Sequence, residues 1–579
     1  MRALKITLVS LMSGLLVACG GGSGGSGGGA LPLPPGAATN SIITNLVADQ
    51  VFSGPAATSD SEFDLASAVT LSSGGGDANL TVAYDAAQKS YTVSVSGRSQ
   101  TFRPADVISN ANGEVRYQKD GAAGRDRLTL VTTPYSGGAS NRYVGMGYWQ
   151  RSSVVSSRQS DRFATFVYGL ETSAASMPRT GQARFGIDVF GLATIPGFEP
   201  SVLQGEGEFN VDFMAGVFST RASLYETGLL TGEGVFGGGI ELQGAGLLSS
   251  SASSFSGNVT VGSRNANLTG SLAGRFYGPA ADELGATFSA SGGSGTIVGS
   301  FTGQRREGPA ANLTLTNIVA PETFFAHGTA LFVETVPDRP GAGVRTQRMI
   351  GQFRDQTGGQ FTFSPGYSHM AGGTFTPDSI VGSSDPNFTT HQATFGEADV
   401  RLDLYKVGQS NSELSLTYSS LGRWRSLERA GVGTTIQHHH FVYGLETPQR
   451  LLASRTGSAR YEGVVYGAAA VGATGEEFDV RGASVFDVNF SRQSYSGDLT
   501  LNGRNDNRSV DFGRYDFSGQ LGARTSIAII TRNGVEVGDL ETRFFGPSGE
   551  EIGGDFSIRS PEDVHEGVII TGVTVARRQ

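Results

Sequence analysis

The chain has little cysteine, little charge and no long helical periodicity. It holds one Cys in 579 residues, so no disulfide can form within it and stability must come from packing and strand pairing. Charged residues make up 17% of the chain, and the formal net charge of −10 argues against the basic surface that nucleic-acid binding needs. No long segment repeats apolar residues at helical spacing over three turns. Long helices, a disulfide scaffold and a nucleic-acid partner are therefore not expected.

Short alternating stretches separated by turn residues fill most of the chain. Glycine is the commonest residue, with 85 copies. Apolar and polar residues alternate in YTVSVSG at 91–97, LTLVTT at 128–133 and LSLTYSS at 414–420. This period of two is typical of antiparallel strands with one face in water. The sequence therefore predicts an all-β protein, and its length predicts several domains.

The usual signatures of catalysis are missing from the sequence. It contains no G-x-S-x-G elbow, no H-E-x-x-H and no phosphate-binding loop. We therefore predict that the protein is not an enzyme, and we predict no cofactor.

All seven histidines lie in the second half of the chain, and three of them form the run QHHHFVYG. On a strand, His438 and His440 share one face and His439 points the other way, so a two-histidine metal or haem contact is a weak candidate. The alternative is three solvated or pairing histidines on a strand. We favour that alternative because no Cys or acidic third ligand stands at a useful spacing.

The N-terminus carries the most specific signal. Two positive charges precede an apolar run at 6–17, which is too short for a membrane-spanning helix and typical of a signal-peptide core. The run ends in Leu16-Val17-Ala18-Cys19, which resembles the bacterial lipobox, and this resemblance implies that Cys19 is lipidated. The alternative, a buried thiol, fits poorly with the GGGSGGSGGG that follows. Gly20 is not the Asp of the inner-membrane retention signal, so we expect the outer membrane. We assign 1–18 to the signal peptide and 19–40 to a lipidated Gly/Ser/Pro tether.

The second half of the chain repeats the first. FVYGLET at 166–172 recurs unchanged at 441–447, and RTGQARF at 179–185 corresponds to RTGSARY at 455–461. The only two tryptophans, Trp149 and Trp424, are 275 residues apart. Matches in the same order at nearly one offset predict two lobes, 41–306 and 307–579. The strand sets before and after each Trp suggest two subdomains per lobe, with boundaries near 155 and 430.

A second duplicated string predicts a structural corner. GRFYGPAADELGATFSA at 274–290 recurs as TRFFGPSGEEIGGDFSI at 542–558. Aromatic residues end a strand, Gly-Pro stops it, one acidic turn follows, and a glycine suited to a left-handed cap precedes the next strand. The two acids of each turn resemble a paired-carboxylate site, but neighbours on one turn do not converge on a cleft. We therefore expect the glutamates to cap or salt-bridge the corner. The corner residues are Phe276, Tyr277, Gly278, Pro279, Glu283, Gly285, Phe544, Phe545, Gly546, Pro547, Glu551 and Gly553.

Together the lipobox, the poly-Gly tether, FVYGLET with RTGQARF, and FYGPAADELG resemble the transferrin-binding protein B family of bacterial surface lipoproteins. The resemblance implies two tandem homologous lobes, each a β-rich handle followed by an antiparallel eight-stranded barrel. The subdomains are then the N-lobe handle at 41–155, the N-lobe barrel at 156–306, the C-lobe handle at 307–430 and the C-lobe barrel at 431–579. The family motifs designate no binding residue, so the ligand-binding residues stay unassigned.

The same resemblance implies a function in binding. It predicts a lipid-anchored outer-membrane protein, displayed at the cell surface, that captures an iron-carrier protein or a related metal or haem ligand. It also implies delivery to a TonB-dependent receptor. The alternative is an adhesive or structural envelope lipoprotein that presents its barrel loops to a protein partner. A neighbouring gene for a TonB-dependent receptor would favour the first function over the second.

Overall fold

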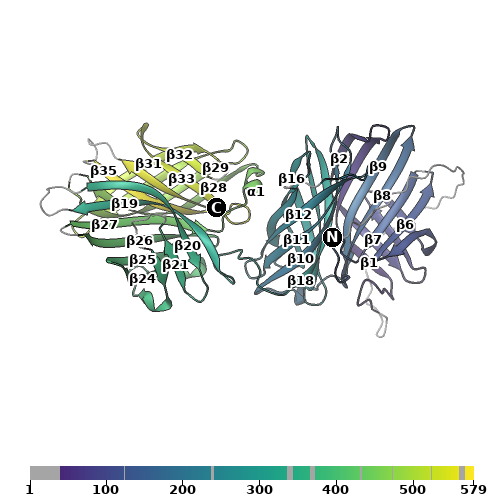
Figure 1. The fold of residues 1–579 in the computed structure, drawn as a ribbon, viewed down its shortest axis with the longest axis horizontal. Helices are drawn as coiled ribbons and strands as arrows, with labels where there is room; N and C mark the ends of the chain where they lie inside the picture. Colours follow the sequence, from purple (N-terminus) through teal and green to yellow (C-terminus); the bar gives the residue numbers. More distant parts are fainter. Residues whose placement is uncertain are drawn as a thin grey trace. The chain divides into compact units, whose positions relative to one another are not determined.

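The computed structural model describes residues 39–579 except 123, 236–239, 336–342, 366–371, 431–432, 473, 523–524 and 560–566. It divides into two units, residues 1–307 and 308–579, which we call the N-lobe and the C-lobe (Figure 1). Strands dominate both units, and the described residues contain one α-helix, α1 (Gln449–Ala453). Short 3₁₀ turns occur at η1 (Pro104–Asp106), η2 (Ala174–Ser176), η3 (Pro377–Ser379) and η4 (Gly408–Ser410). Within this part of the chain, no helix has the length and apolar character needed to cross a membrane.

The N-lobe begins with a nine-stranded antiparallel sheet, the handle. Its strand order is β4-β3-β2-β1-β9-β8-β7-β6-β5. Side chains alternate along β9, so Phe166 packs in the handle core with Trp149. The neighbouring Thr165 faces the barrel, and its hydroxyl forms a 2.6 Å hydrogen bond with the Ser300 hydroxyl. The strands are β1 (Gln50–Asp64), β2 (Val69–Asp85), β3 (Ser90–Val95), β4 (Arg98–Phe102), β5 (Val107–Ala111), β6 (Glu114–Gly121), β7 (Gly124–Val131), β8 (Val144–Val155) and β9 (Arg158–Gly169).

The rest of the N-lobe is a closed barrel. Eight of its strands each pair with two neighbours, and closure comes from the pairings β10–β18 and β11–β12. The ninth strand, β13, pairs only with β12. The strands are β10 (Gln182–Thr194), β11 (Ser201–Asp212), β12 (Val217–Gly228), β13 (Gly234–Val235), β14 (Glu241–Leu248), β15 (Ser254–Gly262), β16 (Asn267–Tyr277), β17 (Glu283–Gly292) and β18 (Gly295–Arg306).

The C-lobe repeats this plan. Its handle sheet has the order β22-β21-β20-β19-β27-β26-β25-β24-β23, and β28 to β35 form a closed eight-stranded barrel. The handle strands are β19 (Glu322–Thr335), β20 (Gly343–Asp355), β21 (Phe361–Ser364), β22 (Gly373–Phe375), β23 (Ile380–Val381), β24 (Phe388–Phe395), β25 (Ala398–Tyr405), β26 (Ser419–Ala430) and β27 (Gly433–Gly444). The barrel strands are β28 (Ser458–Val471), β29 (Glu477–Asn489), β30 (Ser494–Arg504), β31 (Ser509–Gln520), β32 (Ser526–Arg532), β33 (Val535–Phe545), β34 (Glu551–Arg559) and β35 (Val568–Arg578).

The barrel interiors are packed cores. In the N-lobe, Phe209 stacks on Phe218 with ring centroids 4.8 Å apart, and it contacts Phe255 at 4.9 Å. Phe255 in turn lies 5.2 Å from Phe276 of the corner. The small barrel is thus filled by large side chains that alternate with outward residues, as its size requires.

The all-β, duplicated handle-and-barrel fold predicted from the sequence is confirmed, but the subdomain boundaries within each lobe are wrong. The predicted limits of 155 and 430 fall at the ends of β8 and β26, whereas β9 and β27 still belong to the handles. The barrels begin at β10 and β28. The error has a physical cause: the last handle strand pairs with the first one, β1 or β19, and this long-range pairing leaves no local mark in the sequence.

Candidate functional site

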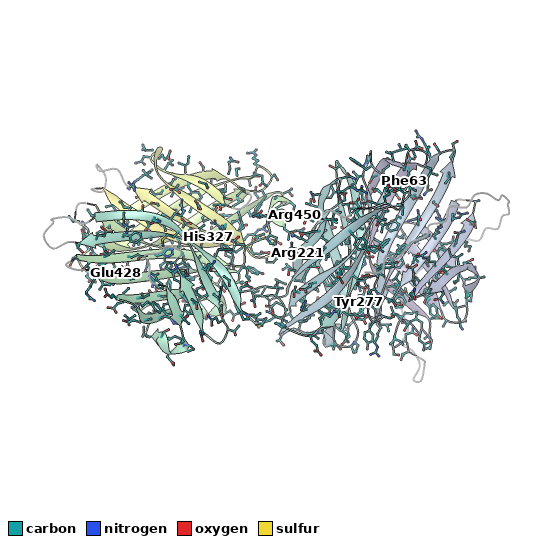
Figure 2. All side chains as sticks on the ribbon, viewed as in Figure 1. Phe63, Arg221, Tyr277, His327, Glu428 and Arg450 are labelled. Carbon is teal, nitrogen blue, oxygen red and sulfur yellow. The ribbon has the colours of Figure 1, made fainter. Side chains whose placement is uncertain are left out.

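The duplicated corner is a tight strand reversal in the barrel. In the N-lobe, β16 ends at Tyr277, which Figure 2 labels, and Gly278 follows in the left-handed region with φ +84°. Ala281 is the second left-handed residue, with φ 56°, and its side chain is fully buried. Strand β17 then begins at Glu283. A glycine at 278 is required because a Cβ there would lie 2.6 Å from the Tyr143 ring of the handle.

Glu283 fastens this corner to the handle. Its carboxylate accepts hydrogen bonds from three successive backbone N–H groups, those of Arg142 (2.7 Å), Tyr143 (2.8 Å) and Val144 (3.0 Å). These groups lead into β8 of the handle sheet. Burial raises the pKa of the Glu283 carboxyl above its ordinary value, and the three N–H donors oppose this rise. The glutamate therefore satisfies backbone donors that would otherwise be buried without partners at the joint.

The C-lobe copy repeats the arrangement with one more donor. The Glu551 carboxylate accepts from the backbone N–H groups of Thr417 (2.6 Å), Tyr418 (3.1 Å) and Ser419 (2.8 Å). The Ser419 hydroxyl also donates to it, at 2.7 Å. Glu551 is only 1% exposed, and its burial raises the pKa of this carboxyl.

The FVYGLET repeat ends at the same joint. Its last residue, Thr172, donates its backbone N–H to Phe276 O at 2.9 Å and its hydroxyl to Gly278 O at 2.6 Å. Thr447 makes the same two bonds to Phe544 O and Gly546 O, at 2.9 and 2.6 Å. The two most strongly repeated motifs of the sequence are therefore the two halves of one handle-to-barrel joint.

The glutamates were expected to cap or salt-bridge the corner. Their carboxylates accept backbone N–H groups, as a cap does, but those groups belong to the handle, and within the described residues neither glutamate forms a salt bridge. One expectation for the corner was wrong. Gly285 is not a left-handed cap, since it lies inside β17 and pairs with Arg275. A Cβ at Gly285 would lie 2.9 Å from Val144 Cγ2, so this glycine allows the barrel to approach the handle closely. Gly553 likewise lies inside β34.

The histidine run lies on β27 with the predicted alternation. His438 Nε2 is 2.5 Å from the Glu477 Oε2 of the barrel. His439 points into the handle, where its ring contacts Phe363 and Phe441 at 5.9 and 5.4 Å. Burial lowers the pKa of His439 to about 3 and that of His440 well below its ordinary value, so both rings are neutral at pH 7.

His438 and His440 therefore lie at the contact between handle and barrel rather than in an open metal site. Within the residues that the structure describes, no group of three or more His, Cys, Asp or Glu could hold a metal ion. His391 is paired with the Ser379 hydroxyl at 2.9 Å, and His327 Nε2 lies 3.4 Å from Glu446 Oε1. Cys19, His369 and His565 lie outside the described residues.

The N-lobe carries an exposed apolar surface at its loop tips, which we call the distal patch: Leu65, Val154, Val155, Phe198 and Leu230. Val155 is 75% exposed and Phe198 is 46% exposed. Sequence reasoning did not single out these residues, because no motif marks them. The one available signal was large apolar residues in turns, such as Phe198 after Pro196-Gly197.

Backbone hydrogen bonds hold the tips of the distal patch together. Leu65 N donates to Ser157 O at 2.8 Å, which joins the β1–β2 and β8–β9 hairpins. Thr70 N donates to Phe198 O at 2.8 Å. The Glu199 carboxylate then accepts from Leu230 N, also at 2.8 Å. The patch is therefore a preorganised surface built from four chain segments.

The distal patch and the start of the described chain lie at opposite ends of the N-lobe. The chain enters beside the corner, where Ile43 N donates to Arg142 O at 2.9 Å. Figure 2 labels Phe63, just before the distal hairpin, at one end of the lobe and Tyr277 of the corner towards the other. The described chain therefore begins at the corner end of the N-lobe, opposite to the distal patch.

The chain is thus a two-lobed protein in which each lobe joins a handle sheet to a closed eight-stranded barrel. Residues 454–578 match the family model for the C-lobe and N-lobe beta barrels of Tf-binding protein B, so the C-terminal barrel is similar to the barrels of that family. The resemblance to transferrin-binding protein B drawn from the sequence motifs is confirmed in this barrel. No curated protein matches the chain.

Several solved structures of transferrin-binding protein B are similar to the chain. A double mutant from Haemophilus parasuis Hp5 is 13% identical, with 78% of this chain and 85% of that chain covered and a TM-score of 0.28. Intact Ap-TbpB, with its N and C lobes, is 13% identical over 90% of this chain and 95% of that chain, with a TM-score of 0.27. The isotype 1 protein from serogroup B Neisseria meningitidis is 16% identical over 78% and 89%, with a TM-score of 0.25.

Proposed function

We propose that the protein is a surface lipoprotein, anchored to the outer membrane through Cys19, that binds an iron-carrier protein through the distal patch. The observation that carries this proposal is the position of the patch. It is exposed, apolar and held by backbone hydrogen bonds at the end of the N-lobe opposite to the first described residues. Exposed apolar side chains gathered on neighbouring loops are typical of protein interaction sites.

The packing of the lobes supports binding of a protein rather than of a small molecule inside a barrel. The N-lobe barrel is filled by aromatic side chains. The distal patch instead offers Phe198 as an aromatic anchor on loops that are already ordered, which reduces the entropy lost on binding. We infer a binding protein and not an enzyme.

We infer the kind of ligand, and its transfer to a receptor, from the similarity to transferrin-binding protein B. The similar structures are named as transferrin-binding proteins, and the C-terminal barrel is similar to the barrels of that family. An iron carrier of the transferrin kind is therefore our first candidate ligand, and a haem protein the second. We further propose that the ligand passes to a TonB-dependent receptor in the same membrane.

The ligand proposal is tested with the mature chain and purified iron-loaded transferrins and haemoglobin, by biolayer interferometry. The double variant Val155→Asp/Phe198→Asp should weaken binding about thirtyfold, since a central apolar anchor is worth about 2 kcal/mol. Met214→Asp is the matched control, because Met214 is 56% exposed in the β11–β12 turn, outside the patch. If neither these proteins nor a pull-down from iron-limited culture shows an iron carrier, a haem protein or a receptor, the adhesive alternative replaces this function.

The anchor is tested separately by palmitate labelling in the native host. The wild-type chain should be labelled and membrane-bound. Cys19→Ala should be unlabelled and shed, yet fold with the same unfolding profile, because the described strands and cores are built from residues after 39. An unlabelled wild-type product that is freely soluble would contradict the lipidation of Cys19.

A further inference from the structure

The outer face of the C-lobe barrel carries a surface concavity of about 740 Å³ across β28, β29, β30 and β31. A row of neutral polar residues crosses it in register. Ser458 is the cross-strand partner of Asn489, Asn489 of Ser494, and Ser494 of Gln520. The neighbouring Tyr495 is buried in the barrel, so strand alternation directs this row outward.

A second outward row lies beside the first. Arg460 is opposite Asp487, Asp487 opposite Ser496, and Ser496 opposite Ser518. Arg460 Nη1 donates to both carboxylate oxygens of Asp487, at 3.0 and 3.1 Å. The concavity is therefore floored by a two-by-four array of side chains whose spacing is set by the barrel ladder.

Most of these groups have unused hydrogen-bonding capacity. Within the part of the chain that the structure describes, the side chains of five array residues make no hydrogen bond: Ser458, Ser494, Ser496, Ser518 and Gln520. Hydroxyl and amide groups both donate and accept. The array thus presents paired donors and acceptors to solvent.

Three charged side chains line the concavity: Arg460, Asp487 and Arg492. Arg460 pairs with Asp487, and also with Glu462, which lies beside the lining. Arg492 therefore adds one positive charge beside a floor of mostly neutral polar groups, and a strongly cationic ligand is disfavoured.

An apolar ledge borders the array on the next strand. Ile527 pairs with Gln520 and Ile529 with Ser518 across β31 and β32. Both side chains are largely exposed on the outer face of the barrel: Ile527 is 57% exposed and Ile529 is 49% exposed. Polar groups in register beside an aliphatic surface suit a ligand that has both hydroxyls and C–H faces.

The N-lobe lacks this array at the matching place. There the corresponding first row runs Gln182, Asp212, Val217 and Leu247, in which the last two residues are apolar. Asp212 and Val217 are also buried. The array is therefore a feature of the C-lobe and not a general consequence of building this barrel.

We propose that this array is a binding site for a neutral oligosaccharide. Sugar hydroxyls act as donor and acceptor at once and match neutral Ser, Asn and Gln side chains, whereas the C–H faces of the ring pack on Ile527 and Ile529. Four strands span about 14 Å, so the array accommodates a chain of several sugar units. The volume of the concavity falls in the usual range for ligand sites. The site goes beyond the proposed capture of an iron carrier and does not involve the distal patch.

The test uses the mature chain and a probe set of linear neutral hexasaccharides (maltohexaose, cellohexaose and mannohexaose), with binding followed by calorimetry and saturation-transfer NMR. The wild type should show saturable binding to at least one probe, unchanged by added salt. Ser494→Val/Ser518→Val should weaken it about tenfold or more, since it removes two hydrogen-bonding groups. Valine suits an outward strand position, so the variant should fold. Asp487→Asn is a second variant that should weaken binding through the Arg460 pair.

Thr500→Val is the matched control, because Thr500 is an exposed outward residue of β30 that does not line the concavity. It should bind like the wild type. Absence of binding to every probe, or binding that survives both Ser494→Val/Ser518→Val and Asp487→Asn, would overturn the proposal. A sulfated hexasaccharide that binds more tightly, with salt dependence and loss in Arg492→Gln, would overturn the neutral class of ligand. The variants of the distal patch should leave this binding intact.

Discussion

Removal of the buried joint glutamate tests whether handle and barrel are held together as described. Glu551→Ala leaves three backbone N–H groups and the Ser419 hydroxyl without their acceptor in a site that is 1% exposed. Each lost partner of a buried donor costs about 1–3 kcal/mol. The carboxylate, however, also loses its own desolvation penalty when it is removed. We therefore expect a net loss of about 3–5 kcal/mol in the free energy of unfolding of the C-lobe.

The assay exploits the single buried tryptophan of each handle, Trp149 and Trp424. In a Trp149→Phe background the fluorescence reports only on the C-lobe, and urea unfolding with and without Glu551→Ala gives the difference. The reciprocal background, Trp424→Phe, should show no change in the N-lobe transition. A loss below about 1 kcal/mol in the C-lobe would refute the role of this glutamate, because it would mean that carboxylate desolvation cancels all four hydrogen bonds.

The pH dependence of C-lobe stability gives an independent check on Glu551. Burial raises the folded-state pKa of Glu551, so the folded chain binds its proton more tightly than the unfolded chain does. This group's contribution to stability therefore falls as pH rises from the ordinary value of 4.5 through the raised folded-state pKa, and is constant above it. Glu551→Gln, which does not titrate, should lack this part of the pH dependence. A wild type and a Glu551→Gln variant with parallel stability curves over that range would contradict the assignment.

Three further perturbations follow from the same contacts. Gly285→Ala places a Cβ 2.9 Å from Val144 Cγ2 and should cost the N-lobe about 1–3 kcal/mol by Trp149 fluorescence, whereas Gly293→Ala, with no atom within 4 Å, should cost much less. Arg348→Ala leaves the buried Asp555 carboxylate without the guanidinium that donates to it at 2.5 Å, so we expect a loss of about 3–5 kcal/mol in the C-lobe, and no loss would contradict this pairing. His439 has its pKa lowered to about 3 by burial, so its contribution is present above pH 6.5 and is lost as pH falls towards 3, by about 1.4 kcal/mol per pH unit. His439→Phe should remove that acid sensitivity in stability measurements from pH 7 to 4, and an unchanged slope would show that the ring is not held neutral.

Local features of the sequence predicted the elements, and long-range contacts decided the rest. The alternation around His439 and the Gly278-Pro279 stop are local, and both predictions were correct because each depends only on neighbouring residues. The role of Glu283 was missed because its donors at 142–144 lie about 140 residues earlier in the chain. Gly285 was assigned to a cap because a glycine after a turn is typical of one, but the packing of Val144 against it outweighs that local preference. The distal patch could not be predicted, since only the assembled fold brings its loop tips together.

The two lobes share their joint but differ in the charges that flank it. Arg348 and Asp77 occupy the same handle position. Arg348 pairs with Thr329, which pairs with His440 on its other side. Asp77 pairs with Ala57, which pairs in the same way with Thr165, and His440 and Thr165 both stand directly before the repeated FVYGLET. In the C-lobe, Arg348 contacts the barrel acids Asp539 and Asp555. In the N-lobe, Asp77 accepts hydrogen bonds from the barrel hydroxyls of Ser271 and Ser289.

This difference constrains how the duplicated halves can pair. An N-lobe handle on the C-lobe barrel would place Asp77 against Asp539 and Asp555, which would leave like charges together in a site where Asp555 is 1% exposed. A C-lobe handle on the N-lobe barrel would place the partly buried Arg348 guanidinium opposite the hydroxyls of Ser271 and Ser289 instead of two acids. Both mismatched pairings are penalised, whereas the repeated glutamate joint alone would fit either handle to either barrel. The two lobes therefore share the glutamate joint, while the charge at this one handle position matches the handle to the barrel that it contacts in each lobe.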